Sequence, residues 1–376
     1  MGLLKGTLTF SRYRLLGPLP KNFHDFISRQ IKHNAFRELT AAGEEKSAGW
    51  TSLENVLDTN FEYANYAVGD YLAFSLRLDR KAIPPSLMRV RLLEAEKKTL
   101  SSKGKKGLSK GEREEIKERV RLDLLSKTQP VPSFFDVCWS LSQNWVLFGS
   151  LSAKVIEEFE SLFKKTFNLP LSPLVPWDPK MIDRSLVEKI ASLKDGVFLN
   201  PENAEGGKSG APLLGREFLT WLWFKSEERG GMIQIPGIGD VEVAFARRLV
   251  LESGGGEYSE SLVCQGLHAG LKEGKAGVQE GKKVKEARIQ LGVGPDRFEF
   301  TLKADQFQFQ TLRLLSGMGM EEEEDEEKGG RILERVYLME TVTKTVDQLF
   351  SLFLKKRLSP QWLGEEIPRI KKWVQK

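Results

Sequence analysis

Hydrophobic and polar residues alternate in several stretches of the chain, which is the pattern of a strand with one buried face. Every second residue from 72 to 78 is Leu or Phe, so a strand is predicted over residues 71–80. Residues 3–16 alternate in the same way, and residues 137–149 predict a hairpin that turns at 142–144. Five more strands are predicted in the second half of the chain, over 232–236, 241–251, 284–291, 296–303 and 306–315.

Other stretches have the 3.6-residue period of an amphipathic helix. Residues 152–167 carry a stripe of Val, Ile, Leu and Phe, and residues 331–357 carry a similar stripe. The second of these predicted helices ends with Lys355, Lys356 and Arg357, the charge that the helix dipole favours at a C-terminus. Asn22 is placed to cap a helix that reaches about residue 39, and residues 40–66, around Trp50, are expected to form a loop.

A pair of helices is predicted between the early strand and the hairpin. Pro84 and Pro85 begin the first, which runs into a Lys-rich break at residues 101–107. Ser109 and Glu112 have the spacing of a capping box for the second, over residues 110–127. On this helix four cations fall within about 80° of one another, beside an apolar stripe of Ile116, Val120 and Leu124: Lys110, Arg113, Lys117 and Arg121. We expect one side of the helix to dock and the neighbouring side to be cationic.

These elements predict an α+β protein with mixed or antiparallel sheets and flanking helices. Proline recurs every three residues or so within 168–177, so that stretch cannot be helical and is the best boundary between domains. We predict an N-terminal α+β half over residues 1–177, which includes the basic helix 110–127. The C-terminal α+β half then covers residues 178–376 and includes the long helix 331–357.

Composition narrows the class of protein. The chain has 376 residues, and 40% of them are hydrophobic, enough for a sizeable core. Its two cysteines exclude a disulfide scaffold and a four-cysteine zinc site. No apolar run approaches the roughly 20 residues that span a bilayer, and the first residues lack the apolar core of a signal peptide. A soluble cytoplasmic protein is therefore expected.

The net charge of +5 conceals a strong segregation of charge. Residues 97–127 carry 11 basic and 5 acidic side chains, and residues 351–376 carry 7 basic and 2 acidic ones. Residues 321–327 are all Glu or Asp and offset one of these basic blocks in the sum. Such segregation bears on solubility and on charged partners rather than on the fold. A solvated surface remains the plain alternative for each block.

Few residues suggest catalysis. The three histidines have no metal-ligand spacing, and Gly207-Lys208-Ser209 lacks the earlier glycine that a phosphate-binding loop needs. Asp240 and Glu242 stand two apart on one face of a predicted strand, where both carboxylates could hold Mg²⁺. Glu273 and Lys275 have a spacing found in nucleases but fall in a stretch expected to be an exposed loop. No catalytic residue, metal or cofactor is predicted, and a metal-dependent DNA nuclease using Asp240 and Glu242 is the alternative.

The order of features over residues 1–177 resembles the RdgC family of bacterial recombination-associated proteins. The resemblance rests on Gly49-Trp50, the stretch Arg80 to Pro85, the Lys-rich break, Trp139, and the helix that runs into residues 169–174. It extends more thinly to residues 218–222, to 241–251 with Arg247-Arg248, and to the closing helix.

The resemblance implies an α+β homodimer that closes into a ring around double-stranded DNA. Such proteins bind DNA with little sequence preference, lie with the nucleoid, and restrain RecA-driven strand exchange. The residues that match the family's DNA-facing segments are Lys103, Lys105, Lys106, Lys110, Arg113, Lys117, Arg121, Arg247 and Arg248. The family's interface aromatic is displaced here, which leaves Phe134 or Phe135 as the candidate at the dimer interface.

The residues themselves agree with sequence-independent DNA binding. Such binding needs Lys and Arg to neutralise phosphates and does not need side chains that read bases. Signals for a helix-turn-helix, a zinc finger or an OB-fold are absent from the sequence. Two other hypotheses stay open, namely the nuclease and an interaction protein that does not touch DNA.

Overall fold

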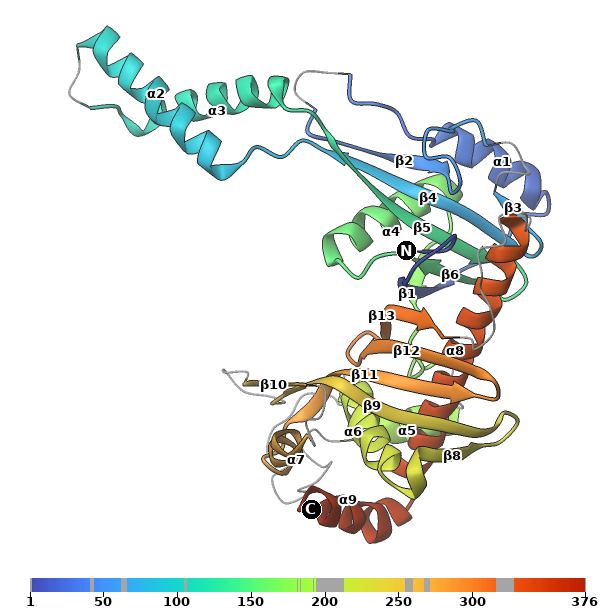
Figure 1. The fold of residues 1–376 in the computed structure, drawn as a ribbon. Coiled ribbons are helices and arrows are strands. Elements are labelled where there is room, and N and C mark those ends of the chain that lie inside the picture. The colour runs from blue at the N-terminus through green and yellow to red at the C-terminus, as the bar shows by residue number, and fades with distance from the viewer. Residues whose placement is uncertain are drawn as a thin grey trace.

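The computed structural model describes residues 2–40, 44–61, 66–104, 107–180, 182, 184–191, 193, 213–253, 260–266, 271–315 and 328–375. These described residues form a bowed stack of strands with helices packed along it, and a helical hairpin projects from one end (Figure 1). The acidic run 321–327 and the residues Lys105 and Lys106 lie outside the described residues, as does the side chain of Arg247.

The strands of the two halves join into one sheet. Their bounds are β1 Leu8–Leu15, β2 Lys46–Ser52, β3 Ala67–Val68, β4 Tyr71–Arg80, β5 Val131–Ser140, β6 Trp145–Phe148, β7 Leu171–Pro173, β8 Met232–Ile235, β9 Gly239–Glu252, β10 Ser261–Gln265, β11 Lys283–Val293, β12 Asp296–Lys303 and β13 Gln308–Leu314. The order is β10-β9-β11-β12-β13-β1-β6-β5-β4-β2, with β3 on β4, β7 on β1 and β8 on β9. Strand β1 is the link, because it pairs with β13 on one side and with β6 on the other.

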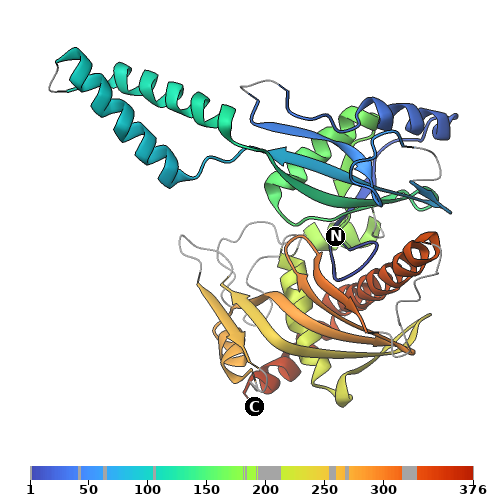
Figure 2. The ribbon, with the colours of Figure 1, turned by 45° about the horizontal axis from the view of Figure 1, so that its top comes forward.

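The helices are α1 Phe23–His33, α2 Pro85–Lys103, α3 Lys110–Lys127, α4 Ala153–Phe167, α5 Arg184–Ala191, α6 Leu214–Ser226, α7 Lys272–Gln279, α8 Lys328–Arg357 and α9 Ile367–Val374. A second view shows α2 and α3 reaching away from the sheet, while α8 runs beside it (Figure 2). The named strands pair antiparallel, which confirms the α+β class and the antiparallel form of the predicted sheets. None of the helices in the described part of the chain combines the length and apolar character needed to cross a membrane.

The N-terminal half has an aromatic core between the sheet and helices α1 and α4. Trp50 is fully buried, its ring meets Phe74 edge-on, and its Nε1 donates to Thr166 Oγ1 at 2.8 Å. The predicted loop over 40–66 is therefore wrong, since residues 46–52 form β2 around this tryptophan. Gly49 is required here, because a Cβ would lie 2.3 Å from the Cα of Phe36.

The helix expected to reach residue 39 also ends early. Helix α1 stops at His33 because Ala35 pairs with Trp50 in a short parallel bridge, in which Trp50 accepts from the Phe36 N–H and donates to the Asn34 carbonyl. Asn22 occupies the N-cap position but makes no side-chain capping bond. In contrast, the bounds of the predicted strand 71–80 and of the predicted helix 110–127 are confirmed to the residue. The predicted helix 152–167 begins one residue later, at Ala153.

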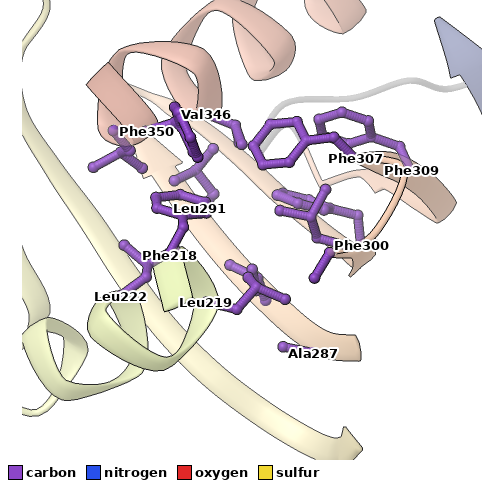
Figure 3. Close-up of a cluster of buried hydrophobic side chains, with 14 of the residues drawn as sticks. Phe218, Leu219, Leu222, Ala287, Leu291, Phe300, Phe307, Phe309, Val346 and Phe350 are labelled. Atoms are coloured by element: carbon purple, nitrogen blue, oxygen red, sulfur yellow. The ribbon is translucent and has the colours of Figure 1, made fainter. Parts of the chain in front are cut away.

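The C-terminal half has the larger core, built by α6 and α8 against strands β11 to β13 (Figure 3). Phe218 of α6 meets Phe307 and Phe350 with ring centroids 5.7 and 5.4 Å apart. Beside it, the buried carboxylate of Glu217 accepts hydrogen bonds from Arg357 Nε at 2.8 Å and Lys283 Nζ at 3.3 Å. Two cations thus neutralise the charge that α6 buries.

Candidate nucleic-acid interface

The predicted basic helix is one half of the projecting hairpin, and helices α2 and α3 together are called the arm from here on. Ser109 Oγ accepts a hydrogen bond from the Glu112 backbone N–H, and the Glu112 carboxylate accepts one from the Ser109 backbone N–H, so the predicted capping box is confirmed. At the end of α2, Gly104 adopts the left-handed conformation that often closes a helix. The apolar stripe of α3 turns inward, with Ile116 and Leu124 buried.

The cations predicted on α3 differ in how they are paired. Lys110 and Arg113 are exposed and have no ionic partner among the described residues. Lys103 pairs with Glu112 at 2.9 Å, and Lys117 lies 3.9 Å from Glu114. Arg121 is half-buried between Glu45 and Glu118. Lys110 and Arg113 are therefore the two that could exchange counterions for DNA phosphates without first breaking an ion pair.

Helix α2 supplies cations that the sequence reasoning did not assign to a site. Arg89, Lys97 and Lys98 are exposed on it and have no ionic partner within the described part of the chain. The sequence carried a signal for two of these cations, because Lys97 and Lys98 lie in the basic stretch of residues 97–127. The arm thus presents positive charge on both of its helices.

The arm also exposes apolar side chains, which is unusual for a solvated surface. Helix α2 buries no residue at all. The exposed fractions are 38% for Leu87, 52% for Val90, 58% for Leu93 and 47% for Leu122. Strand β5, which follows α3, adds Val131 at 62%. These side chains are free to meet another surface.

The two candidate interface aromatics point to opposite faces of β5. Phe135 turns inward and packs on Phe148 with ring centroids 5.9 Å apart. Phe134 is 37% exposed at the base of the arm, with the guanidinium of Arg77 5.7 Å from its ring centroid. A fork of hydrogen bonds to Asp79 raises the pKa of Arg77 and keeps it charged beneath the ring. Of the two, only Phe134 is placed to contact a partner.

The pair Arg247-Arg248 lies far from the arm in the fold, on β9 of the C-terminal half. Between Phe245 and Leu249 the pairing with β11 shifts, so extra residues of β9 stand opposite the partner strand. Bulges of this kind redirect side chains at a sheet edge. Arg248 is exposed, and its Nη1 donates to Gln265 Oε1 at 3.3 Å.

The proposed nuclease carboxylates are both exposed on one face of β9, as predicted from their spacing. Glu242 lies 3.8 Å from Arg297. Among the described residues, no three side chains of His, Cys, Asp or Glu converge as metal ligands would.

The expected loop around Glu273 and Lys275 is wrong, because these residues belong to helix α7. Gly274 lets the helix approach α6 and strand β9, since a Cβ there would lie 3.0 Å from Trp223 and 3.2 Å from Leu249. Lys275 pairs with Glu227 at 2.8 Å and sits over the ring of Trp373. This lysine therefore serves packing in the C-terminal half.

Comparison with known families places the arm inside a matched region. Residues 10–182 match the model of a family described as "RdgC: Putative exonuclease, RdgC". The match runs from β1 to just before α5 and covers the arm, Phe134 and Phe135, whereas Arg247-Arg248 and Asp240 lie beyond it. No curated protein matches the chain.

Proposed function

Since the chain belongs to the RdgC family through residues 10–182, we propose that it is a dimeric clamp that encircles duplex DNA without sequence preference and modulates RecA-dependent recombination. Membership supports a recombination-associated DNA-binding role at the level of the family. The closed ring, the antagonism with RecA and the association with the nucleoid go beyond the family match and form part of the proposal. The observation that carries the proposal is the arm, which exposes unpaired cations and apolar side chains together.

The cations supply the affinity for DNA. A clamp that does not read bases gains its affinity from phosphate contacts and counterion release. Lys110 and Arg113 on α3 are the first contacts, and the exposed cations of α2 are further ones. Arg247 and Arg248 on β9 would meet the duplex from the C-terminal half of the chain.

The exposed apolar residues of the arm supply the contact surface for a second subunit. Leu93, Leu122 and Phe134 would leave apolar surface in water in a monomer, whereas contact with a second copy removes it. Closure at the arm would retain the protein on DNA by topology, so that weak contacts at each site still give a long residence.

Salt-dependent binding to a duplex tests the DNA contact. We expect Lys110→Glu/Arg113→Glu to flatten the slope of log K against log salt by about two per subunit. Arg29→Glu/Lys32→Glu on α1 makes the same change of charge on exposed residues away from the arm and should leave the slope near that of the wild type. Equal slopes in both variants would show that the arm does not contact DNA. If the wild type does not bind DNA near physiological salt, a partner other than DNA is favoured.

Retention on circular DNA tests the ring. A closed clamp should stay on covalently closed circles when the salt is raised and slide off linear DNA of the same length. Phe134→Asp should abolish this difference and lower the mass in solution towards that of a monomer. A wild type that leaves both DNA forms equally fast would contradict closure but not DNA binding.

A nuclease is the second candidate, because the matched family's description includes exonuclease. It predicts Mg²⁺-dependent release of nucleotides that is lost in Asp240→Asn/Glu242→Gln. Release that persists in this double variant would exclude these two carboxylates as the catalytic pair.

A further inference from the structure

A cavity of about 250 Å³ lies between the β1–β6 ribbon and helix α8, away from the arm. Its floor is the face of β1 and β6 where Arg12 pairs with Leu147 and Arg14 with Trp145. Its wall is one side of α8. The lining residues on this wall are Glu340, Thr343, Lys344 and Asp347.

The lining leaves one positive charge uncompensated. Arg12 is 5% exposed and binds Asp347 with two hydrogen bonds, of 2.8 and 2.9 Å. Lys344 pairs with Glu340 at 2.6 Å. Arg14 is half-buried and has no ionic partner among the described residues. Both carboxylates are therefore already neutralised, which disfavours a cationic ligand, and Arg14 remains as a binding group for an acidic one.

The cavity also has an aromatic wall. Trp145 is half-buried and stands against Tyr71, with ring centroids 5.8 Å apart. An arginine beside an accessible indole is suited to a planar group that carries negative charge.

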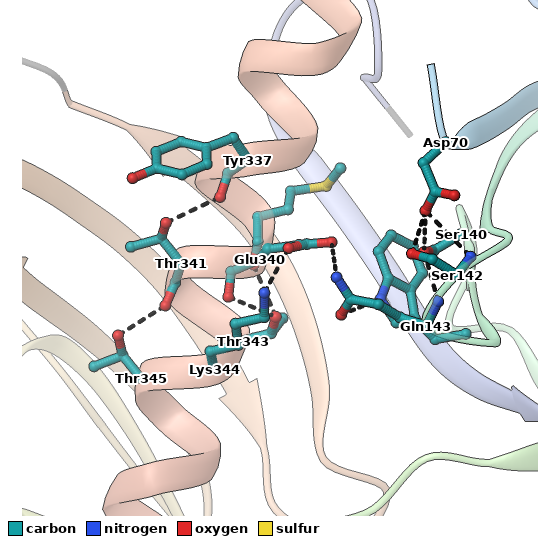
Figure 4. A network of polar contacts seen from close by, with 12 residues as sticks. Asp70, Ser140, Ser142, Gln143, Tyr337, Glu340, Thr341, Thr343, Lys344 and Thr345 are labelled. Carbon is teal, nitrogen blue, oxygen red and sulfur yellow. Dashed lines mark hydrogen bonds and ion pairs between the residues drawn. The ribbon is translucent and has the colours of Figure 1, made fainter. Parts of the chain in front are cut away.

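The residues around the cavity are held in place by a polar network (Figure 4). Gln143 donates to Glu340 Oε1 at 3.4 Å and accepts from Trp145 Nε1 at 3.4 Å. Asp70 accepts from the hydroxyl of Ser140 and from the backbone N–H of Ser142, which fixes the turn before β6. A site held in this way loses little conformational entropy when a ligand binds.

We propose that this cavity binds a small planar anion of mononucleotide size, with its ring against Trp145 and its phosphate or carboxylate on Arg14. The volume lies just below the usual range for small-molecule pockets, about 300–1,000 Å³, which limits the ligand to one such unit. The site joins β1 and β6 of the N-terminal half to α8 of the C-terminal half. A bound ligand therefore stabilises the contact between the halves and raises the thermal midpoint.

Trp145 provides a direct readout, because it is the one tryptophan of the eight that is not buried. Acrylamide should therefore quench mainly Trp145, and Trp145→Phe should remove the quenchable part of the emission. We expect AMP at about 1 mM to protect the wild type from quenching, and adenosine to bind at least about tenfold more weakly.

Two variants separate the site from general effects. Arg14→Ala should weaken AMP at least about tenfold, whereas Arg184→Ala, which removes an exposed arginine on α5, should bind AMP as the wild type does. Arg14→Lys keeps the charge and should restore part of the binding, which guards against a misfolded alanine variant. The absence of protection by AMP, or equal protection in Arg14→Ala, would overturn the proposal.

The phosphate could come from a free nucleotide or from the end of a strand. A 5′-phosphorylated oligonucleotide that protects Trp145 better than AMP would assign the site to strand ends, and the reverse order would assign it to free nucleotides. Lys110→Glu/Arg113→Glu should bind AMP normally, so a failure of the DNA clamp and a failure of this site can be told apart.

Discussion

Helices α6 and α2 show how differently two helices of one chain can be used. Helix α6 buries ten of its 13 residues, including the run from Glu217 to Phe224. Helix α2 has 19 residues and buries none. Packing against the core dictates the sequence of α6, whereas α2 is supported by α3 and leaves Leu87, Val90 and Leu93 exposed for an outside surface. Substitutions should therefore affect stability in α6 and binding in α2.

The largest effect is expected from Phe218→Ala, which opens a cavity among the rings of Phe307, Phe350 and Phe353. Removing a buried Phe side chain costs about 4 kcal/mol of unfolding free energy. Urea denaturation measures it. Leu93→Ala on α2 should change that free energy by at most about 0.5 kcal/mol when the protein is dilute enough for the subunits to separate. In the proposed dimer the loss should be larger and should shrink on dilution, because the second copy covers Leu93. A large loss that persists on dilution would mean that Leu93 is buried within its own chain.

The buried charge of α6 offers the next test. Glu217→Gln keeps a hydrogen-bonding side chain but removes the charge that the buried Arg357 binds. Breaking a buried ion pair from one side costs about 3 kcal/mol. Denaturation of Glu217→Gln/Arg357→Met, which also removes this cation, should show recovery of part of the loss. Additive losses in this double variant would show that the ion pair contributes nothing.

A smaller and local effect is expected in the arm. Ser109→Ala removes the capping bond to the Glu112 backbone and should cost about 1 kcal/mol, confined to the start of α3. Hydrogen exchange should then be about fivefold faster for the amides of the first hydrogen-bonded turn of α3, which begins at Arg113, and unchanged in α6. Equally faster exchange in α6 would mean that the arm and the core unfold together, which would erase the contrast between them.

The elements that sequence reasoning found are those whose local signals and tertiary contacts agree. The capping box of α3 and the hydrophobic alternation of β4 were each sufficient to predict the element, because nothing elsewhere in the fold opposes these local signals. Strand β2 and helix α7 were missed, because Trp50 and Gly274 take their roles from partners far along the chain, Phe74 and Trp223. A polar or glycine-rich stretch gives no local sign of such partners.

The same limit applies to the candidate sites. The basic residues of the arm could be found from charge alone, but which of them are paired depends on Glu45 and Glu114 in the folded chain. The cavity beside α8 could not be predicted, since it brings Arg14 next to residues more than 300 positions later. Two arginines alternating on a buried strand were its only trace in the sequence.

The two halves also bury carboxylates in different ways, and this difference predicts a dependence on pH. No cation among the described residues is bonded to Asp136 of β5, unlike Glu217. Asp136 accepts hydrogen bonds from the Leu3 backbone N–H at 3.1 Å and from Ser75 Oγ at 3.2 Å. Burial raises its pKa above the ordinary value of 3.8, although these bonds and the charge of Arg335 oppose the shift. The folded protein therefore keeps the proton to higher pH than the unfolded chain does.

This sign determines the direction of the effect. Below the ordinary Asp range both states are protonated, and as the pH rises the unfolded chain ionises first, so Asp136 contributes less stability until its folded pKa is passed. In Asp136→Asn the side chain stays neutral at every pH, so the variant should lack this pH-dependent contribution to stability. The unfolding free energy of the wild type minus that of Asp136→Asn, measured by denaturation from pH 4 to 7, should therefore fall with rising pH and then level off. A difference that rises over this range would mean that Arg335 and the hydrogen bonds outweigh burial, and that Asp136 is as well compensated as Glu217.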